Sequence, residues 1–320
     1  MILSGGSILA SRLSMAQVQK TPNVKPGVWP VMYSPFTESR AVDYNAVKEM
    51  TEFYVATKVS GIFAAALSGE VFVLSFDEAL EIGRQTVRQA DGRIGVVVGA
   101  NVGSSIEEQA ANLARMQEIG VDAAVILLSR LPSADDIEGQ LIKLMELTKG
   151  PLGIYECPAP DHRQVTVQTV RRIAQTGRFH FIKETSRDAE VCGAKAQAAK
   201  GTPLRVFSAT LSILPKALDL GADGHCGTVA NICPELTKIM CETKDNAERE
   251  RVYKSLEAIN SIVVNDAYPS SGKYLLQKRG LHLTPVSRSG NMGEFTEDVR
   301  KALDEFLKHF DFQRGLIPEQ

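Results

Sequence analysis

The segment Phe179-His180-Phe181-Ile182-Lys183-Glu184-Thr185-Ser186 lies between two helical patterns and is typical of a β-strand. In a strand alternate side chains share one face, so Lys183 points the same way as Phe179 and Phe181. An ammonium group on an apolar face is costly unless it is paired or neutralised, and burial lowers the pKa of a lysine. A neutral amine in a dry pocket forms Schiff bases with carbonyl substrates, which makes Lys183 a candidate catalytic residue. The alternative is a structural lysine that reaches solvent from a strand end.

Apolar runs of this kind occur eight times along the chain, with amphipathic stretches between them. The predicted strands are residues 28–34, 61–67, 94–100, 123–128, 152–156, 180–184, 205–209 and 224–229. The predicted helices are residues 43–57, 76–89, 105–119, 137–148, 167–176, 188–199 and 211–220, and several follow good capping residues, namely Asp43, Ser75, Thr166, and Ser104 with Glu107. This alternation favours an α/β fold, a (β/α)8 TIM barrel. A doubly wound open sheet is the alternative, but no GxGxxG motif follows the first strand.

The pattern after Val229 is helical, over about residues 233–244, 247–264, 270–279 and 294–309. We therefore predict a flexible leader over residues 1–26 and a barrel over residues 27–232. Residues 233–320 are predicted to form the last barrel helix and a helical C-terminal extension. Residues 1–37 contain no Asp or Glu. The first segment is interpreted either as a leader before a true start at Met15 or as a targeting segment.

The composition excludes several classes of function. The 320 residues are 44% hydrophobic and 23% charged, with a net charge of −2 and no basic cluster, so we expect neither nucleic acid nor an anionic membrane as a partner. No apolar run approaches the length of a membrane span. Five cysteines form no CxxC pair, and five histidines form no zinc-binding motif. We therefore expect reduced cysteines, a cytoplasmic protein, and no metal or cofactor.

Four short motifs lie in chain order close to the ends of predicted strands, where barrel enzymes carry their active sites. They are Ser68-Gly69-Glu70 with Leu74-Ser75, Gly153-Ile154-Tyr155 with Pro158, Ile182-Lys183-Glu184-Thr185, and residues 221–231 with Gly224, Ala230 and Asn231. Together they resemble the dihydrodipicolinate synthase and N-acetylneuraminate lyase superfamily. Its members are class I, Schiff-base-forming aldolases of the pyruvate type on a (β/α)8 barrel. The resemblance runs from about residue 27 to about residue 281.

The resemblance implies roles for individual residues. Lys183 would condense with the ketone carbon of a 2-oxo acid, and Tyr155 would be the general acid and base. Ser68 and the backbone N–H groups of the Leu67–Ser68 turn would hold the substrate carboxylate. The backbone carbonyl of Cys226 would lie near the lysine. The resemblance also implies a homotetramer or a homodimer. On its own, Tyr155 could equally fill the barrel, and Ser68 could be an ordinary turn residue.

Several positions depart from the family pattern and indicate a divergent member. Leu67 stands where a first hydroxyl residue is usual, and Ser129 stands where a second tyrosine is usual. Glu156 replaces an asparagine, and Pro160 replaces an arginine with which the synthase holds its second substrate. These departures argue against a true dihydrodipicolinate synthase and against a sialic acid lyase. We predict a lyase, either an aldolase or a dehydratase, that acts on a 2-oxo acid; a 2-keto-3-deoxy sugar acid is the candidate substrate.

Further polar residues could contact the far end of a substrate: Arg130 and Arg163, together with His162 and His225. Glu70 is expected to order its loop rather than to touch the substrate. Two other functions stay open. The run Gly221-Ala222-Asp223-Gly224 resembles a barrel phosphate site and would suit a phosphorylated substrate. The missing hydroxyls would also suit a catalytically degenerate regulator that binds a 2-oxo acid.

Overall fold

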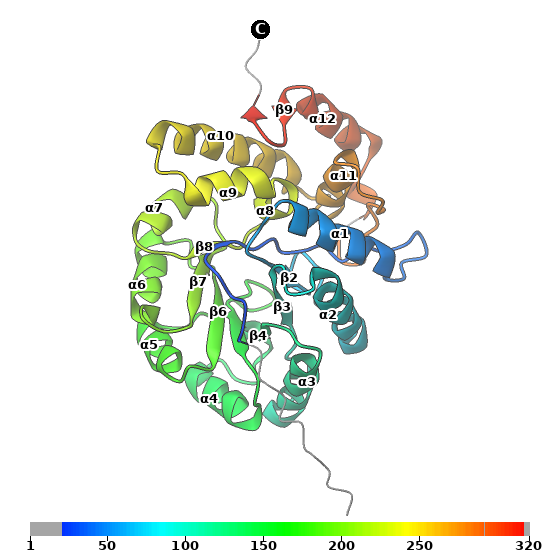
Figure 1. Ribbon diagram of the computed structural model, residues 1–320. Helices are drawn as coiled ribbons and strands as arrows, with labels where there is room; N and C mark the ends of the chain where they lie inside the picture. The colour runs from blue at the N-terminus through cyan, green and yellow to red at the C-terminus, as the bar shows by residue number, and fades with distance from the viewer. Residues whose placement is uncertain (1–20, 291, 317–320) are drawn as a thin grey trace, which may run out of the picture.

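Eight parallel strands form a closed barrel in the computed structural model, which describes residues 21–290 and 292–316 (Figure 1). The strand order is β1-β8-β7-β6-β5-β4-β3-β2. Backbone hydrogen bonds from Ser60 to Val28 (3.0 Å) and from Phe63 to Pro30 (2.9 Å) join the two outer strands. The strands are β1 (Gly27–Val28), β2 (Gly61–Ala64), β3 (Gly95–Gly99), β4 (Ala123–Leu127), β5 (Leu152–Tyr155), β6 (Phe179–Glu184), β7 (Arg205–Ser208) and β8 (Gly224–His225). The predicted (β/α)8 barrel is confirmed.

Seven helices alternate with the strands and cover the outside of the barrel (Figure 1). They are α1 (Tyr44–Ala56), α2 (Phe76–Ala90), α3 (Ile106–Glu118), α4 (Ile137–Leu147), α5 (Val167–Gln175), α6 (Ala189–Ala199) and α7 (Leu214–Asp219). The predicted caps Asp43, Ser75 and Thr166 are confirmed. The cap predicted at Ser104 was wrong by one residue. Ser105 caps α3, while Ser104 donates to the Glu108 carboxylate at 2.8 Å.

Three strands end more than one residue earlier than predicted. The first stops at Val28, shortly before Pro30, which has no N–H to donate to a neighbouring strand. The second stops at Ala64, because Ala65 has a φ of 49° and turns the chain out of the sheet. The eighth stops at His225, and residues 229–232 form the short helix α8 (Val229–Ile232) instead of strand.

An aromatic cluster fills the barrel interior. The ring of Phe181 lies 5.2 Å from that of Trp29, 5.6 Å from that of Phe63 and 5.0 Å from that of Phe207, measured between centroids. A Cβ at Gly61 would lie 2.2 Å from the Trp29 ring, so the glycine makes room for the indole. The alternation predicted for β6 is therefore correct, because Phe181 and Lys183 face the same interior.

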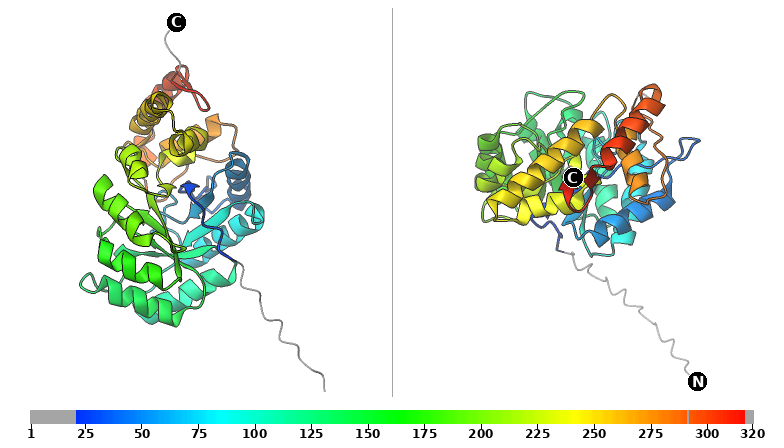
Figure 2. Two further views of the ribbon diagram at one scale, coloured as in Figure 1. Left: turned by 60° about the vertical axis from the view of Figure 1, so that its left-hand side comes forward. Right: turned by 90° about the horizontal axis from the view of Figure 1, so that it is seen from above.

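The remaining helices gather on one side of the barrel, at the top of Figure 1, and Figure 2 shows them from two further directions. They are α9 (Pro234–Glu242), α10 (Asn246–Val263), α11 (Ser270–Lys278) and α12 (Glu297–Leu307), followed by a hairpin of β9 (Phe310–Asp311) and β10 (Gly315–Leu316). The structure also has two 3-10 helices, η1 (Leu128–Arg130) and η2 (Met292–Glu294). A second apolar cluster holds this extension together through residues such as Leu256, Ile259 and Leu303.

The chain approaches the barrel before β1. The backbone N–H of Asn23 donates to Asp122 at 2.8 Å, and the Trp29 indole donates to the carbonyl of Lys25 at 3.0 Å. Most of the predicted leader and Met15 lie outside the described residues. Among the helices that the structure describes, none has the length and apolar character needed to cross a membrane.

Candidate active site

Lys183 and Tyr155 are neighbours near the C-terminal ends of two adjacent strands. They are paired in the ladder between β5 and β6. The side-chain nitrogen of Lys183 lies 4.4 Å from the centroid of the Tyr155 ring and 5.9 Å from that of Phe63. Only 5% of the Lys183 residue is exposed, and none of the described acidic side chains forms an ion pair with it. Burial lowers the pKa of Lys183, although the thiols of Cys226 and Cys157 favour its charged form.

Tyr155 stays protonated in this setting. Burial raises the pKa of its phenol well above the ordinary value, and the adjacent Cys157 thiol raises that pKa further. A neutral phenol can donate a proton to an oxygen that forms on a substrate and accept one later. The lowered pKa of Lys183 favours the neutral amine, which is the form that attacks a carbonyl in Schiff-base chemistry.

The loop after β2 places Ser68 at the same end of the barrel. Ser68 is buried, whereas the side chain of Leu67 is 36% exposed. Within the described part of the chain, no hydrogen bond is donated by the backbone N–H of Leu67 or Ser68. The loop is held in place by a hydrogen bond from the Ser34 hydroxyl to the carbonyl of Gly69 at 2.6 Å. Two backbone N–H groups of this turn are thus available to a ligand at the barrel end that carries Lys183.

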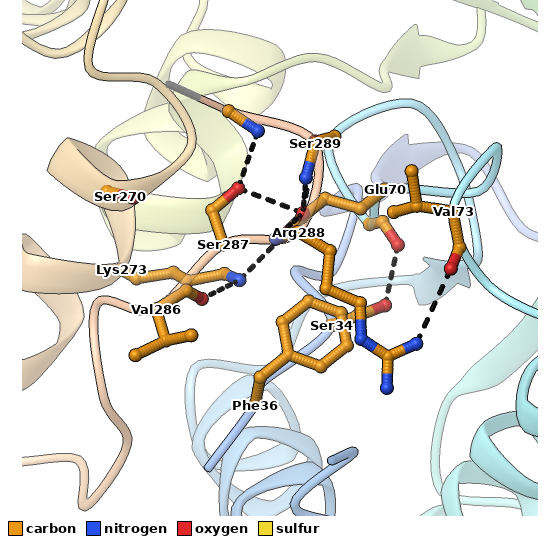
Figure 3. A network of polar contacts seen from close by, with 12 residues as sticks. Ser34, Phe36, Glu70, Val73, Ser270, Lys273, Val286, Ser287, Arg288 and Ser289 are labelled. Atoms are coloured by element: carbon orange, nitrogen blue, oxygen red, sulfur yellow. Dashed lines mark hydrogen bonds and ion pairs between the residues drawn. The ribbon is translucent and has the colours of Figure 1, made fainter. Parts of the chain in front are cut away.

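Glu70 orders this loop, as expected, by a buried network that reaches the C-terminal extension (Figure 3). Its backbone is left-handed, with a φ of 58°. The Lys273 ammonium of α11 donates to the Glu70 carboxylate at 2.6 Å. The hydroxyl of Ser287 (2.9 Å) and the backbone N–H groups of Arg288 (2.7 Å) and Ser289 (2.7 Å) donate to its other oxygen. The carboxylate is therefore fully engaged and is not free for a substrate.

A second buried network lies on the outer face of β5 and β6. Lys195 of α6 donates to Glu156 at 2.7 Å and to Glu184 at 3.0 Å, and all three side chains are almost fully buried. These two carboxylates directly follow Tyr155 and Lys183 in the chain. Sequence reasoning missed Lys195, because it lies in an alanine-rich helix without a marked polar face. The available signal was the pair of glutamates that follow the two candidate catalytic residues.

Arg130 lies in the loop after β4, and Arg163 contacts that loop from the segment after β5. One Arg130 nitrogen donates to the carbonyl of Val71 at 2.8 Å, and its guanidinium lies 5.1 Å from the Phe72 ring. In the described part of the chain, the other terminal nitrogen of Arg130 is buried without a partner, as is the hydroxyl of Ser129. Arg163 is occupied differently, since it donates to the carbonyl of Leu131 at 2.7 Å and to that of Ser133 at 3.1 Å.

The two histidines and the glycine run that the sequence also suggested are bonded to other groups, neutral, or distant from Lys183. The ring of His162 forms a 2.8 Å hydrogen bond with the hydroxyl of Thr185. His225 is buried, and burial lowers its pKa to about 3, so its ring is neutral. The run from Gly221 leads into β8, whose first residue is Gly224, at the barrel end opposite Lys183, and its Asp223 accepts from the backbone N–H of Val206 at 2.8 Å. The predicted likeness to a phosphate site therefore places no phosphate beside Lys183.

A surface hollow of about 520 Å³ lies at that same opposite end, with Gly27, Asp223 and Arg249 among its lining residues. It is far from the strand ends that carry Lys183 and Tyr155, so the candidate site rests on side-chain chemistry rather than on the size of a hollow. No group of described residues has the His, Cys, Asp or Glu cluster expected for a metal site.

Comparison with known proteins identifies the family of this chain. Residues 25–310 match the dihydrodipicolinate synthetase family. The chain belongs to that family. A 4-hydroxy-tetrahydrodipicolinate synthase of Ralstonia nicotianae is 24% identical over 284 residues, which cover 85% of this chain and 94% of the relative. As a family member, the protein is a Schiff-base-forming lyase.

Solved structures support the fold. The dihydrodipicolinate synthase from Acinetobacter baumannii, complexed with pyruvate, aligns with a TM-score of 0.77 and 21% identity over 89% of this chain and 98% of its own. YagE, a prophage protein of the same family from E. coli K12, also in complex with pyruvate, aligns with a TM-score of 0.79 and 19% identity over 88% and 97% of the two chains. At these identities the likeness concerns the barrel and its C-terminal helices.

Proposed function

We propose that this enzyme is a class I lyase that acts on a 2-oxo acid through a Schiff base on Lys183. The observation that carries the proposal is a buried lysine beside the ring of Tyr155, with no counter-ion among the residues that the structure describes. The neutral amine attacks the ketone carbon, and the carbinolamine loses water to give an iminium. The iminium accepts the electron pair when C3 loses a proton or when the C3–C4 bond breaks. Tyr155 donates and accepts the protons that these steps require.

The substrate carboxylate is assigned to the loop after β2. The hydroxyl of Ser68 and the free backbone N–H groups of Leu67 and Ser68 would donate to it. The carbonyl of Cys226, at the end of β8, would face the amine and the carbinolamine hydroxyl. These assignments need no metal and no bound cofactor.

Arg130 is assigned to the far end of the substrate. Its buried nitrogen lacks a partner, and a buried donor without a partner is rare in proteins. A substrate hydroxyl or carboxylate would satisfy it. We assign Arg163 to positioning, because its contacts with the carbonyls of Leu131 and Ser133 hold the loop that carries Arg130.

The proposed substrates are 2-keto-3-deoxy acids, cleaved or dehydrated, rather than those of the synthase. The similar curated proteins are named synthases, yet this chain has Ser129 and Pro160 where the synthase has a tyrosine and an arginine. The test is a turnover screen of 2-keto-3-deoxy acids alongside a synthase assay, with the parent protein and Lys183→Ala. We expect turnover of a keto-deoxy acid by the parent only. A fully active Lys183→Ala variant contradicts the mechanism, and synthase turnover contradicts the substrate assignment.

We propose in addition a cytoplasmic homotetramer or homodimer, on the strength of the family resemblance. Size-exclusion chromatography with multi-angle light scattering tests the assembly of the purified protein. A mass equal to that of one 34.8 kDa chain at micromolar concentration would contradict it.

A further inference from the structure

The C-terminal extension brings a tyrosine to the proposed carboxylate site. Tyr268 lies in the connection between α10 and α11; the residue is half-buried, and its hydroxyl oxygen is fully buried. Its ring meets that of Tyr33 edge to face, with 5.9 Å between the centroids. Its hydroxyl approaches the hydroxyls of Ser68, Tyr33 and Thr228. Residues from four separate parts of the chain therefore surround one point.

Several polar atoms around this point are buried and have no hydrogen-bond partner among the described residues. They are the hydroxyls of Tyr268 and Tyr33 and both side-chain amide atoms of Asn231, which lies beside Tyr33. The neighbouring hydroxyls approach Tyr268 without completing a hydrogen bond of normal geometry. Buried polar groups in native proteins are nearly always paired with protein, water or ligand. Four unpaired atoms on three residues indicate a small polar occupant at this place.

The Tyr268 hydroxyl is a donor under working conditions. Burial raises its pKa, although the hydroxyls of Ser68, Tyr33 and Thr228 act in the opposite direction. The phenol is therefore neutral and can donate to an anion. Tyr268 also contributes to the raised pKa of Tyr155, which places it close to the reacting centre electrostatically.

Two residues of α11 position the C-terminal extension next to Tyr33 and Tyr268. A Cβ at Gly272 of α11 would lie only 2.1 Å from the Tyr33 hydroxyl, so only a glycine leaves room for it. One residue further, Lys273 binds Glu70, two residues beyond Ser68. The extension is thus fixed to the Ser68 loop at a point next to Tyr268.

We propose that Tyr268 donates a hydrogen bond to the carboxylate of the 2-oxo acid held at Lys183, with Tyr33 as a positioning residue. The inference rests on the proposed Schiff-base function. It gives the C-terminal extension a part in substrate binding. Tyr268 would also supply a hydroxyl at a site where the family usually has a hydroxyl residue and this chain has Leu67.

The test compares two carbonyl compounds and one matched control. Parent, Tyr268→Phe and Tyr253→Phe are incubated with pyruvate or with acetaldehyde, which has no carboxylate, and the adducts are reduced with borohydride. Tyr253 is a partly exposed tyrosine of α10 whose hydroxyl contacts Glu257 at 3.2 Å. We expect Tyr268→Phe to need about tenfold more pyruvate for half-maximal adduct, as for one lost hydrogen bond to an anion. With acetaldehyde all three proteins should behave alike.

The outcomes are distinguishable. If folded Tyr268→Phe needs no more pyruvate than the parent, the unpaired atoms hold water and the inference is overturned. If the variant loses adduct formation equally with pyruvate and with acetaldehyde, the role of Tyr268 is purely structural and the inference is also overturned. If the parent itself forms no adduct, the Schiff-base proposal fails instead. If Tyr268→Phe does not fold, Tyr33→Phe provides the same comparison. A loss confined to pyruvate supports the inference, and no loss overturns it.

Discussion

The side-chain nitrogen of Lys183 lies 4.4 Å from the centre of the Tyr155 ring, and the two residues are partners across β5 and β6. This pairing fixes the distance between the proposed nucleophile and the proposed acid and base by backbone hydrogen bonds rather than by mobile loops. None of the described carboxylates pairs with the lysine to stabilise its charge. Both properties favour reactivity at the expense of stability.

Lys183→Met should therefore stabilise the protein at pH 7, by about 2 kcal/mol, because a buried unpaired amine is replaced by an apolar chain of similar length. The pKa of Lys183 is lowered in the folded state, so the charged lysine weakens the native protein below that pKa. The penalty fades as the pH rises toward the ordinary lysine value. Guanidinium unfolding at pH 7 and pH 10 should show a gain that shrinks at the higher pH. A variant less stable than the parent at pH 7 would refute this.

The same pKa predicts how the rate of adduct formation depends on pH. Only the neutral amine attacks a carbonyl, and burial increases its share at neutral pH. The rate at which the borohydride-trapped pyruvate adduct forms should rise with pH and level off below the ordinary lysine pKa of about 10.4. A rate that keeps rising up to pH 10 would indicate an unperturbed lysine.

Lys195→Met tests the network behind the site. It leaves the buried carboxylates of Glu156 and Glu184 together without a cation, which should cost about 3–5 kcal/mol of unfolding free energy. Burial already raises the pKa of Glu156, and loss of Lys195 raises it further. The carboxyl can then be protonated at low pH, so the loss should be smaller at pH 5 than at pH 8.

Lys254→Met is the matched control for that variant. Lys254 forms an ion pair with Glu250 at 2.8 Å, but both side chains are more than 60% exposed. Its removal should change the unfolding midpoint very little. Equal losses in the two variants would show that the buried network has no special part in stability.

Glu70→Gln tests the connection between the Ser68 loop and the C-terminal extension. The buried Lys273 would lose its counter-ion, which should cost about 3 kcal/mol of unfolding free energy and raise the pyruvate concentration needed for adduct formation. Glu78→Gln, which loses the partly exposed pair with Arg288, should cost less. Urea unfolding and adduct titration on both variants provide the check. If the pyruvate requirement does not change in Glu70→Gln, the loop does not depend on this network.

The barrel was predictable because periodicity is local. Apolar runs alternate with amphipathic stretches, and caps such as Ser75 mark where helices begin. Lys183 was predictable for the same reason, since a lysine on a phenylalanine face departs from an otherwise consistent pattern. Strand ends were less predictable. The left-handed Ala65 ends β2 within an apolar run, and nothing in its side chain marks that turn.

The residues that surround the site were not predictable from spacing. Lys273 is 203 positions from Glu70, and Lys195 is 39 positions from Glu156, so no local motif joins either pair. Tyr268 follows a helix that the sequence places outside the barrel. Only the folded chain shows that its hydroxyl approaches that of Ser68.

The most direct test of the central claim is borohydride trapping with pyruvate, followed by intact-protein and peptide mass spectrometry. The account predicts one reduced adduct per chain, located on the peptide that contains Lys183, and none in folded Lys183→Ala. Absence of an adduct in folded parent protein, with pyruvate and with larger 2-oxo acids, would contradict it. So would an adduct that stays in place when Lys183 is replaced.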